Sequence, residues 1–135
     1  MATNYTLKID AGADKFLKLR LIDDEGEYID MSGFSARMKL KKAYDSTEAL
    51  VSLDSEASGG IEFEKFDEDE SPYPDTCSIH ITDEQTGPLV DYTVKDSDGE
   101  VEQGEGVYDL EIVDETGIVV RAIQGMWIAF PEVTK

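Results

Sequence analysis

YDLEIVDETGIVVRAIQGMWIAFPEVTK, residues Tyr108–Lys135, is the stretch of sequence that decides the fold class. Tyr108, Leu110 and Ile112 fall on one face of an extended segment, because side chains of a strand alternate with a period of two. The four residues 114–117 predict a tight reversal, since the glycine at its end adopts a positive φ without strain. A return strand from Ile118 to Phe130 completes a long antiparallel hairpin.

Gly125 interrupts the return strand and predicts a β-bulge that changes which face is buried. Before it, Ile118, Val120 and Ala122 share a face. After it, Met126, Ile128 and Phe130 do. We therefore predict these core residues: Tyr108, Leu110, Ile112, Val120, Ile128 and Phe130. Trp127 points the other way. Two roles stay open for it, a packing residue of the core or rim and a contact with a partner.

The rest of the chain repeats the same period of two. A loosely alternating run occurs at residues 16–22. Further strand-like runs follow around Ile29, Met38, Leu53, Ile61 and Ile79, at an average spacing of roughly ten residues, with Gly, Asp and Ser between them. This pattern predicts an all-β protein, an antiparallel β-sandwich of about seven to nine strands.

One short helical turn is expected near Thr82–Thr86. Thr82 is a good N-cap residue, and Gln85 stands three residues later, which is the spacing of a capping box. Gly87 and Pro88 are expected to end this turn.

Length, charge and hydropathy limit the classes of function that fit this chain. With 135 residues the chain is expected to form a single domain, residues 1–135. The formal net charge of −19 opposes binding to nucleic acid and to anionic lipid, and it favours partners with basic patches. The amino-terminal residues lack a signal-peptide pattern, and no apolar run is long enough to span a membrane. We therefore expect synthesis in a cytoplasm and no membrane partner.

The sequence shows no arrangement of residues typical of catalysis. Cys77, the single cysteine, lies in a strand-like run and is expected to pack in the core. His80 is three positions away, so the two side chains should face opposite sides of the strand and form no nucleophile–base pair. We expect no enzymatic activity.

Two further motifs also lack a function. Gly104-Glu105-Gly106 precedes a strand and not a helix, so it is not a phosphate cradle. The segment with Asp96, Asp98, Gly99 and Glu100 is only partly similar to a calcium loop, because Val107 stands where the bidentate glutamate belongs. We expect no cofactor and no metal site.

Several motifs carry a resemblance to a known family. They are the stretch 106–134, the stretch 78–89 (SIHITDEQTGPL), and Asp30-Met31-Ser32-Gly33-Phe34 followed by Arg37. In this order the motifs resemble a family of small virion proteins of tailed bacteriophages. The layout is similar to the amino-terminal domain of the BppU-like upper-baseplate proteins. The resemblance implies an immunoglobulin-like β-sandwich.

The resemblance also implies a function. It predicts a structural virion protein, made in the host cytoplasm, that serves as a baseplate or tail module and bridges the tail to peripheral fibres. The expected partners are other tail, baseplate or fibre proteins, with several copies in each particle. One alternative is a decoration or cement protein on the capsid exterior. An alternative from another class is a carbohydrate-binding β-sandwich module.

Partner contacts are expected at two places. Residues 90–105 lie where the family passes almost directly into the last hairpin, so they predict an inserted hairpin, and insertions often carry specific contacts. The final strand is expected at or near a sheet edge, where unpaired backbone groups favour docking. The expected contact residues are Met126, Trp127, Ile128, Pro131, Glu132, Val133 and Thr134, with Asp96, Asp98 and Glu100.

Overall fold

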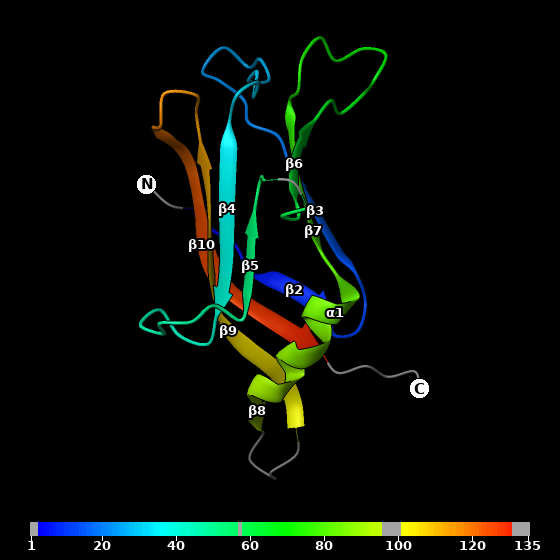
Figure 1. Cartoon of the computed structure of the whole chain (residues 1–135), viewed down its shortest axis with the longest axis vertical. Helices are drawn as coiled ribbons and strands as arrows, with labels where there is room; N and C mark the ends of the chain where they lie inside the picture. The colour runs from blue at the N-terminus through cyan, green and yellow to red at the C-terminus, as the bar shows by residue number, and fades with distance from the viewer. Residues whose placement is uncertain (1–2, 57, 96–100, 131–135) are drawn as a thin grey trace.

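The computed structural model describes residues 3–56, 58–95 and 101–130, which form a sandwich of two β-sheets with one short helix (Figure 1). This confirms the predicted all-β sandwich. The small sheet has the order β3-β7-β6, and the large sheet has the order β1-β10-β9-β4-β5, with β2 also paired to β10 and β8 to β9. The small-sheet strands are β3 (Lys15–Leu19), β6 (Ile61–Glu64) and β7 (Thr76–Ile81). The large-sheet strands are β1 (Thr3–Asn4), β2 (Leu7–Asp10), β4 (Ser35–Lys41), β5 (Val51–Asp54), β8 (Thr93–Lys95), β9 (Val101–Val113) and β10 (Val119–Phe130).

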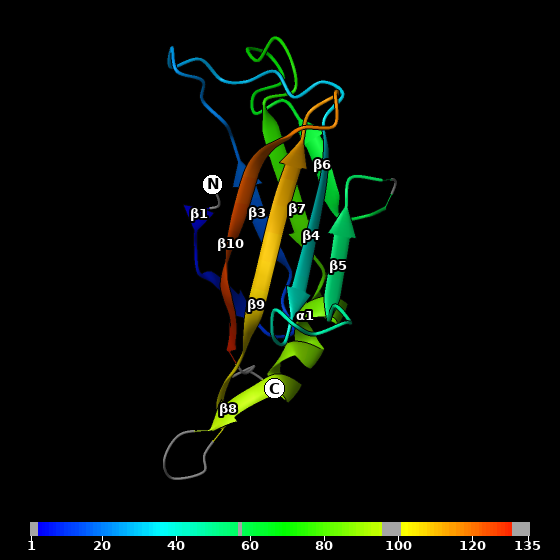
Figure 2. The same cartoon turned by 90° about the vertical axis from the view of Figure 1, so that its left-hand side faces the viewer.

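The predicted terminal hairpin forms the spine of the large sheet. Its two strands, β9 and β10, lie side by side along most of the length of the molecule (Figure 2). At the turn, a carboxylate oxygen of Asp114 accepts hydrogen bonds from the backbone N–H groups of Thr116 and Ile118. Gly117 adopts a φ of 93°, as expected for the last residue of the reversal.

The core contains half of the predicted residues. Tyr108, Leu110 and Ile112 are buried as predicted. The prediction for β10 is wrong, because Val120 and Phe130 are 40% and 37% exposed and Ile128 is only half-buried. The inward side chains of β10 are instead Ile123, Trp127 and Ala129.

The reason for this error is the position of the bulge. The register of β10 against β9 shifts between Val119 and Arg121, whereas Gly125 pairs in regular register with Tyr108. Gly125 has another role. A Cβ atom there would lie 2.3 Å from the carbonyl oxygen of Tyr5, so glycine lets β10 approach the chain at the junction of β1 and β2.

The amino-terminal strands β1 and β2 pair with the edge of β10 that faces away from β9. Thr3 pairs with Ile123 and Leu7 with Trp127, both in parallel orientation. The hydroxyl of Tyr108 donates to the carbonyl of Tyr5 at 2.6 Å, across the same junction. The final strand therefore has partners on both sides and is not an edge. The described residues also form ten strands and include two parallel pairings, β1 with β10 and β2 with β10, where about seven to nine antiparallel strands were expected.

Trp127 is a core residue in this structure. Its side chain is fully buried, and its Nε1–H donates to the carbonyl of Lys41 at 2.9 Å. Gly106 lies opposite Trp127 on β9. A Cβ atom at Gly106 would come within 2.4 Å of the indole nitrogen and 2.2 Å of the Lys41 oxygen, so the absence of a side chain makes room for both groups.

The predicted helical turn is confirmed as α1 (Asp83–Thr86). Its capping box is complete, with Gln85 N–H donating to the Thr82 hydroxyl and Thr82 N–H donating to the Gln85 side chain. The expected stop at Gly87 is wrong, because a 3₁₀ helix, η1 (Gly87–Tyr92), continues from it and buries Leu89. After η1, β8 pairs antiparallel with the start of β9, within the segment 90–105 where an inserted hairpin was expected. The connection between these two strands, residues 96–100, lies outside the described residues.

Replacing Gly106 with alanine should destabilise the protein. The added methyl group would collide with the backbone of Lys41 and with Trp127, and overpacking of this kind costs about 1–3 kcal/mol. Urea denaturation followed by Trp127 fluorescence measures the change. Gly87→Ala is the matched control, because a Cβ atom there meets nothing within 4 Å and its φ is helical. Equal stability of the two variants would contradict this account of Gly106.

Candidate functional site

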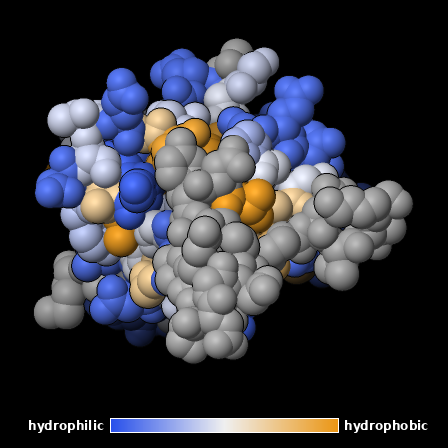
Figure 3. Space-filling model, turned by 90° about the horizontal axis from the view of Figure 1, so that it is seen from below, coloured by the Kyte–Doolittle hydropathy of each residue, from blue (hydrophilic) through white to orange (hydrophobic). Residues whose placement is uncertain are grey.

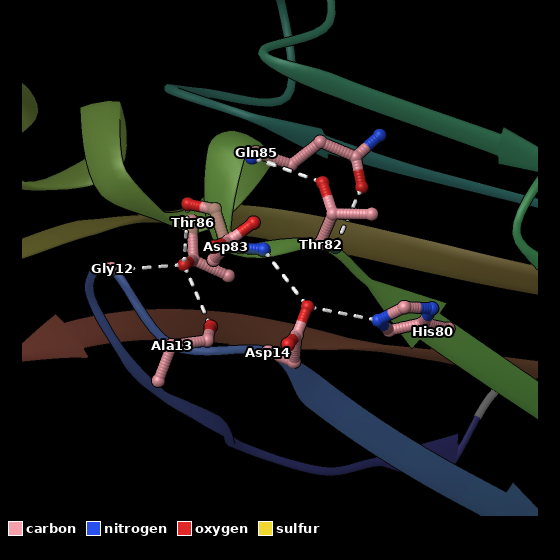
Figure 4. Close-up of polar contacts among 8 residues, drawn as sticks. All are labelled: Gly12, Ala13, Asp14, His80, Thr82, Asp83, Gln85 and Thr86. Carbon is pink, nitrogen blue, oxygen red and sulfur yellow. Dashed lines mark hydrogen bonds and ion pairs between the residues drawn. The ribbon is translucent and has the colours of Figure 1, made fainter.

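A polar cluster joins the start of β3 to the short helix (Figure 4). A carboxylate oxygen of Asp14 lies 3.0 Å from Nε2 of His80 and accepts from the backbone N–H of Asp83 at 3.1 Å. The hydrogen bond with His80 lowers the pKa of Asp14. The Thr86 hydroxyl donates to the carbonyl of Ala13. These contacts tie α1 to the β2–β3 connection, and they bring no nucleophile to His80.

Cys77 and His80 face opposite sides of β7, as the sequence predicts. Cys77 is fully buried between the sheets, and the side chain of His80 is partly exposed on the outer face. Burial raises the pKa of the Cys77 thiol to about 12. Cys77 is therefore a packing residue and not a reactive thiol.

Arg20 connects the two long loops at the opposite end of the sandwich. Its guanidinium lies 3.0 Å from a carboxylate oxygen of Asp75, and it stacks over the rings of Tyr28 and Phe66 at 3.4 and 4.2 Å. Burial acts to raise the pKa of Asp75. Hydrogen bonds from the Phe66 N–H and from Arg20 outweigh this effect and hold the pKa below its usual value. The cluster orders both loops.

In the part of the chain that the structure describes, no group of three or more His, Cys, Asp or Glu side chains is arranged to hold a metal ion. The segment with Asp96, Asp98 and Glu100 lies outside the described residues. Within residues 3–56, 58–95 and 101–130, no helix is long and apolar enough to cross a membrane.

The expected contact residues fall into three groups. Met126 is 44% exposed and Ile128 is half-buried, both with side chains on the outer face of the large sheet. Trp127 is buried and does not reach the surface, so of its two possible roles the structure shows packing. The remaining expected contacts lie outside the described residues, namely Pro131, Glu132, Val133, Thr134, Asp96, Asp98 and Glu100.

The outer face of the large sheet carries two parallel rows of side chains. The first, which we call the apolar row, consists of Met126, Ile128 and Phe130 on β10. The second, the basic row, consists of Arg37, Lys39 and Lys41 on β4, three of the twelve basic residues in the chain. Strand β9 separates the rows, and its Glu111 forms an ion pair with Arg37 at 2.7 Å.

A groove lies on the other side of the molecule, where β5 and α1 meet the outer face of the small sheet. Its cavity volume is about 430 Å³. Phe16, Glu62 and His80 line it together with hydroxyl side chains and Gln85. The Phe16 ring stacks on the His80 ring with 4.4 Å between centroids and 11° between planes.

Sequence reasoning missed this groove. Phe16 belongs to the loosely alternating run at residues 16–22, but it is out of phase with Leu17, Leu19 and Leu21, which pack against the core. An aromatic residue at an outward strand position was therefore the available signal.

Seen from the end that carries α1, hydrophilic residues dominate the rim of the molecule, and hydrophobic surface gathers near the middle (Figure 3).

No protein-family model matches this chain, and no curated protein matches it at a significant level.

Cys77 should resist thiol reagents in the folded protein. Its burial and its pKa of about 12 leave almost no accessible thiolate at pH 8. Labelling with a chromogenic disulfide should then proceed only as fast as the chain unfolds, and it should accelerate sharply above the urea midpoint. Rapid stoichiometric labelling without denaturant would show that the site is open.

Substituting Asp75 with asparagine should lower Tm by several degrees at pH 7, since the ion pair with Arg20 is lost. The pKa of Asp75 is lowered in the folded chain, so its contribution is present above the unfolded pKa of about 4 and is lost as pH falls through the folded value. The difference in Tm between parent and variant should therefore shrink below pH 4. A difference independent of pH would contradict this role.

Proposed function

We propose that this protein is a structural component of a tailed-phage virion, a baseplate or tail module that bridges the tail to peripheral fibres through protein–protein contacts. The family resemblance in the sequence suggests this role. The observation that carries it in the structure is the apolar row, which leaves Met126 44% exposed and Phe130 37% exposed in an otherwise highly charged protein.

The apolar row has the dimensions of the centre of an interface. Three side chains at alternate positions of a strand span about 13 Å. The hydrophilic neighbours of the row, including the basic row two strands away, would form a polar rim around a desolvated centre. A stable contact buries about 800 Å² on each partner, so the interface would extend over much of the sheet face.

The absence of enzymatic activity is part of this proposal. Among the described residues, four carboxylates have lowered pKa values, those of Asp14, Asp30, Asp75 and Asp114. Each of them accepts a hydrogen bond from a backbone N–H group, that of Asp83, Ser32, Phe66 and Ile118 respectively. Their shifted pKa values thus accompany structural roles, and the buried Cys77 offers no nucleophile.

Two alternatives are compatible with the same fold. A decoration or cement protein on the capsid exterior would use the same outer face and would differ only in its place in the particle. A carbohydrate-binding module would instead place a sugar ring against an exposed aromatic side chain, and the 61% exposed Phe16 in the groove favours that alternative.

The apolar row is tested by the double substitution Met126→Glu and Phe130→Glu. Two carboxylates at the centre of an interface would lose apolar burial and would have to be desolvated, so incorporation into particles should fall at least tenfold. Complementation of a phage that lacks the chain, followed by immunoblotting of purified particles, measures this. Circular dichroism checks that the fold is retained.

The control is Ile118→Glu in the β9–β10 turn, where the native side chain is 63% exposed and lies outside the apolar row. It should incorporate like the parent. Equal incorporation of the double variant would exclude the apolar row as the contact. Immunogold labelling confined to the head would favour the capsid alternative, and absence of the chain from particles would overturn the virion role.

A further inference from the structure

We propose that the groove beside β5 and the small sheet is a docking site for an extended basic segment of a partner protein, with an arginine or lysine side chain seated against Phe16 and Glu62. This inference rests on the proposed assembly function and specifies the chemistry of one partner.

The groove is built by outward side chains on neighbouring strands of the small sheet. Phe16 on β3 stands opposite His80 on β7, and Glu62 on β6 stands opposite Ser78 in the adjacent row. Two interstrand steps of about 4.8 Å and one two-residue step of about 6.6 Å place the Cα atoms of Phe16 and Glu62 about 12 Å apart. Both side chains line the same groove, so a long cationic side chain that lies across it can contact the ring at one end and the carboxylate at the other.

The Phe16 ring offers a fixed aromatic face. One side of it stacks on His80, and 61% of the residue is exposed. His80 is in turn held by Asp14, whose carboxylate lies 3.0 Å from Nε2 and is anchored to α1 through the Asp83 N–H. The exposed face of an aromatic ring attracts an ammonium or guanidinium group. Since the stack is already ordered, little side-chain entropy would be lost on binding.

The lining of the groove is acidic. A second hollow of about 300 Å³ adjoins the first and shares Ser58, Gly59, Gly60 and Glu62 with it. Glu56 lines the second hollow, and among the described residues no lysine or arginine lines either one. Lys18 stands in the same outward row as Glu62, across Ser78, and its ammonium lies 3.9 Å from Glu64. Glu62 in the groove and Glu56 in the adjoining hollow thus offer two carboxylates to a basic segment, in a protein of net charge −19.

The shape of the groove fits an extended chain. Ser52 and Leu53 of β5 line it, and among the described residues β5 pairs with a neighbouring strand only on its β4 side. On its other edge Asp54 already forms a bridge with Gly60, and its N–H donates to the carbonyl of Gly59 at 2.9 Å, so an added strand can pair only with the part of β5 before Asp54, as in recognition by strand addition. A partner segment could thus pair along β5 while its basic side chains enter the hollows.

A cationic segment fits this surface better than the other occupants. A second copy of the chain brings a net charge of −19 and would be repelled. A neutral sugar could stack on Phe16, but it would leave the charges of Glu56 and Glu62 unpaired. Anionic ligands are disfavoured by both carboxylates. The charge therefore selects a basic protein segment.

The test uses the full chain and three probes in fluorescence-anisotropy or calorimetric titrations. The probes are a ten-residue peptide of alternating arginine and valine, the same peptide with glutamate in place of arginine, and maltohexaose as a neutral oligosaccharide. We expect the basic peptide alone to bind, with an affinity that falls as NaCl is raised. Amide chemical shifts should change along β5, β6 and β7.

Two variants and two controls locate the contact. Phe16→Ala should weaken the basic peptide about threefold to thirtyfold, the range of a cation–aromatic contact. Glu62→Gln should weaken it about twofold to fivefold. Tyr44→Ala removes an aromatic side chain of the same 61% exposure outside the groove, and Glu25→Gln removes an exposed carboxylate outside it. Both controls should stay within about twofold of the parent.

Several results would overturn the inference. They are no binding of the basic peptide, equal binding by Phe16→Ala and its control, equal binding of the acidic peptide, or maltohexaose binding that depends on Phe16. The outcome is independent of the particle experiments. If the chain is present in particles but its groove fails to bind the basic peptide, only this inference is refuted. If the chain is absent from particles but still binds the peptide, the virion role is refuted.

Discussion

The hydrogen bond from the Trp127 indole to the carbonyl of Lys41 determines how the large sheet is organised. It joins β10 to β4 across β9, and Gly106 on β9 leaves the space through which the two groups meet. With the indole fixed inward, the alternation of the strand requires Met126, Ile128 and Phe130 to point outward. The apolar row on the surface is therefore a direct consequence of the buried tryptophan, and the same strand provides both the core and the proposed contact.

The two outer faces of the sandwich differ in chemistry. The large sheet presents the apolar row and the basic row, whereas the groove beside the small sheet presents the ring of Phe16 and the carboxylate of Glu62. A partner suited to one face is thus poorly suited to the other. For a module proposed to bridge two neighbours in an assembly, such a difference would let each neighbour bind its own face without competing with the other neighbour for the same surface.

Local signals in the sequence predicted local structure well. The hairpin turn at Asp114 and the capping box of Thr82 and Gln85 each depend on residues a few positions apart, and both are present. The buried face of β10 was not predictable in this way, since it depends on where the register against β9 slips. The pairing of β1 and β2 with β10, and the position of Phe16 and Glu62 in one groove, depend on residues that are distant in sequence and that no periodic pattern relates.

The parallel pairing of the first strands with the last one has a consequence for how the chain reaches its native state. Tyr108 and Tyr5 are joined by a hydrogen bond although they are 103 residues apart, and Leu7 and Ile9 have their place beside β10. Closing so long a loop costs conformational entropy before the contacts that stabilise it can form. Folding should therefore be slow for a domain of this size. During translation, Leu7 and Ile9 stay uncovered until the residues of β10 have also left the ribosome. The nascent chain is exposed to aggregation over that interval.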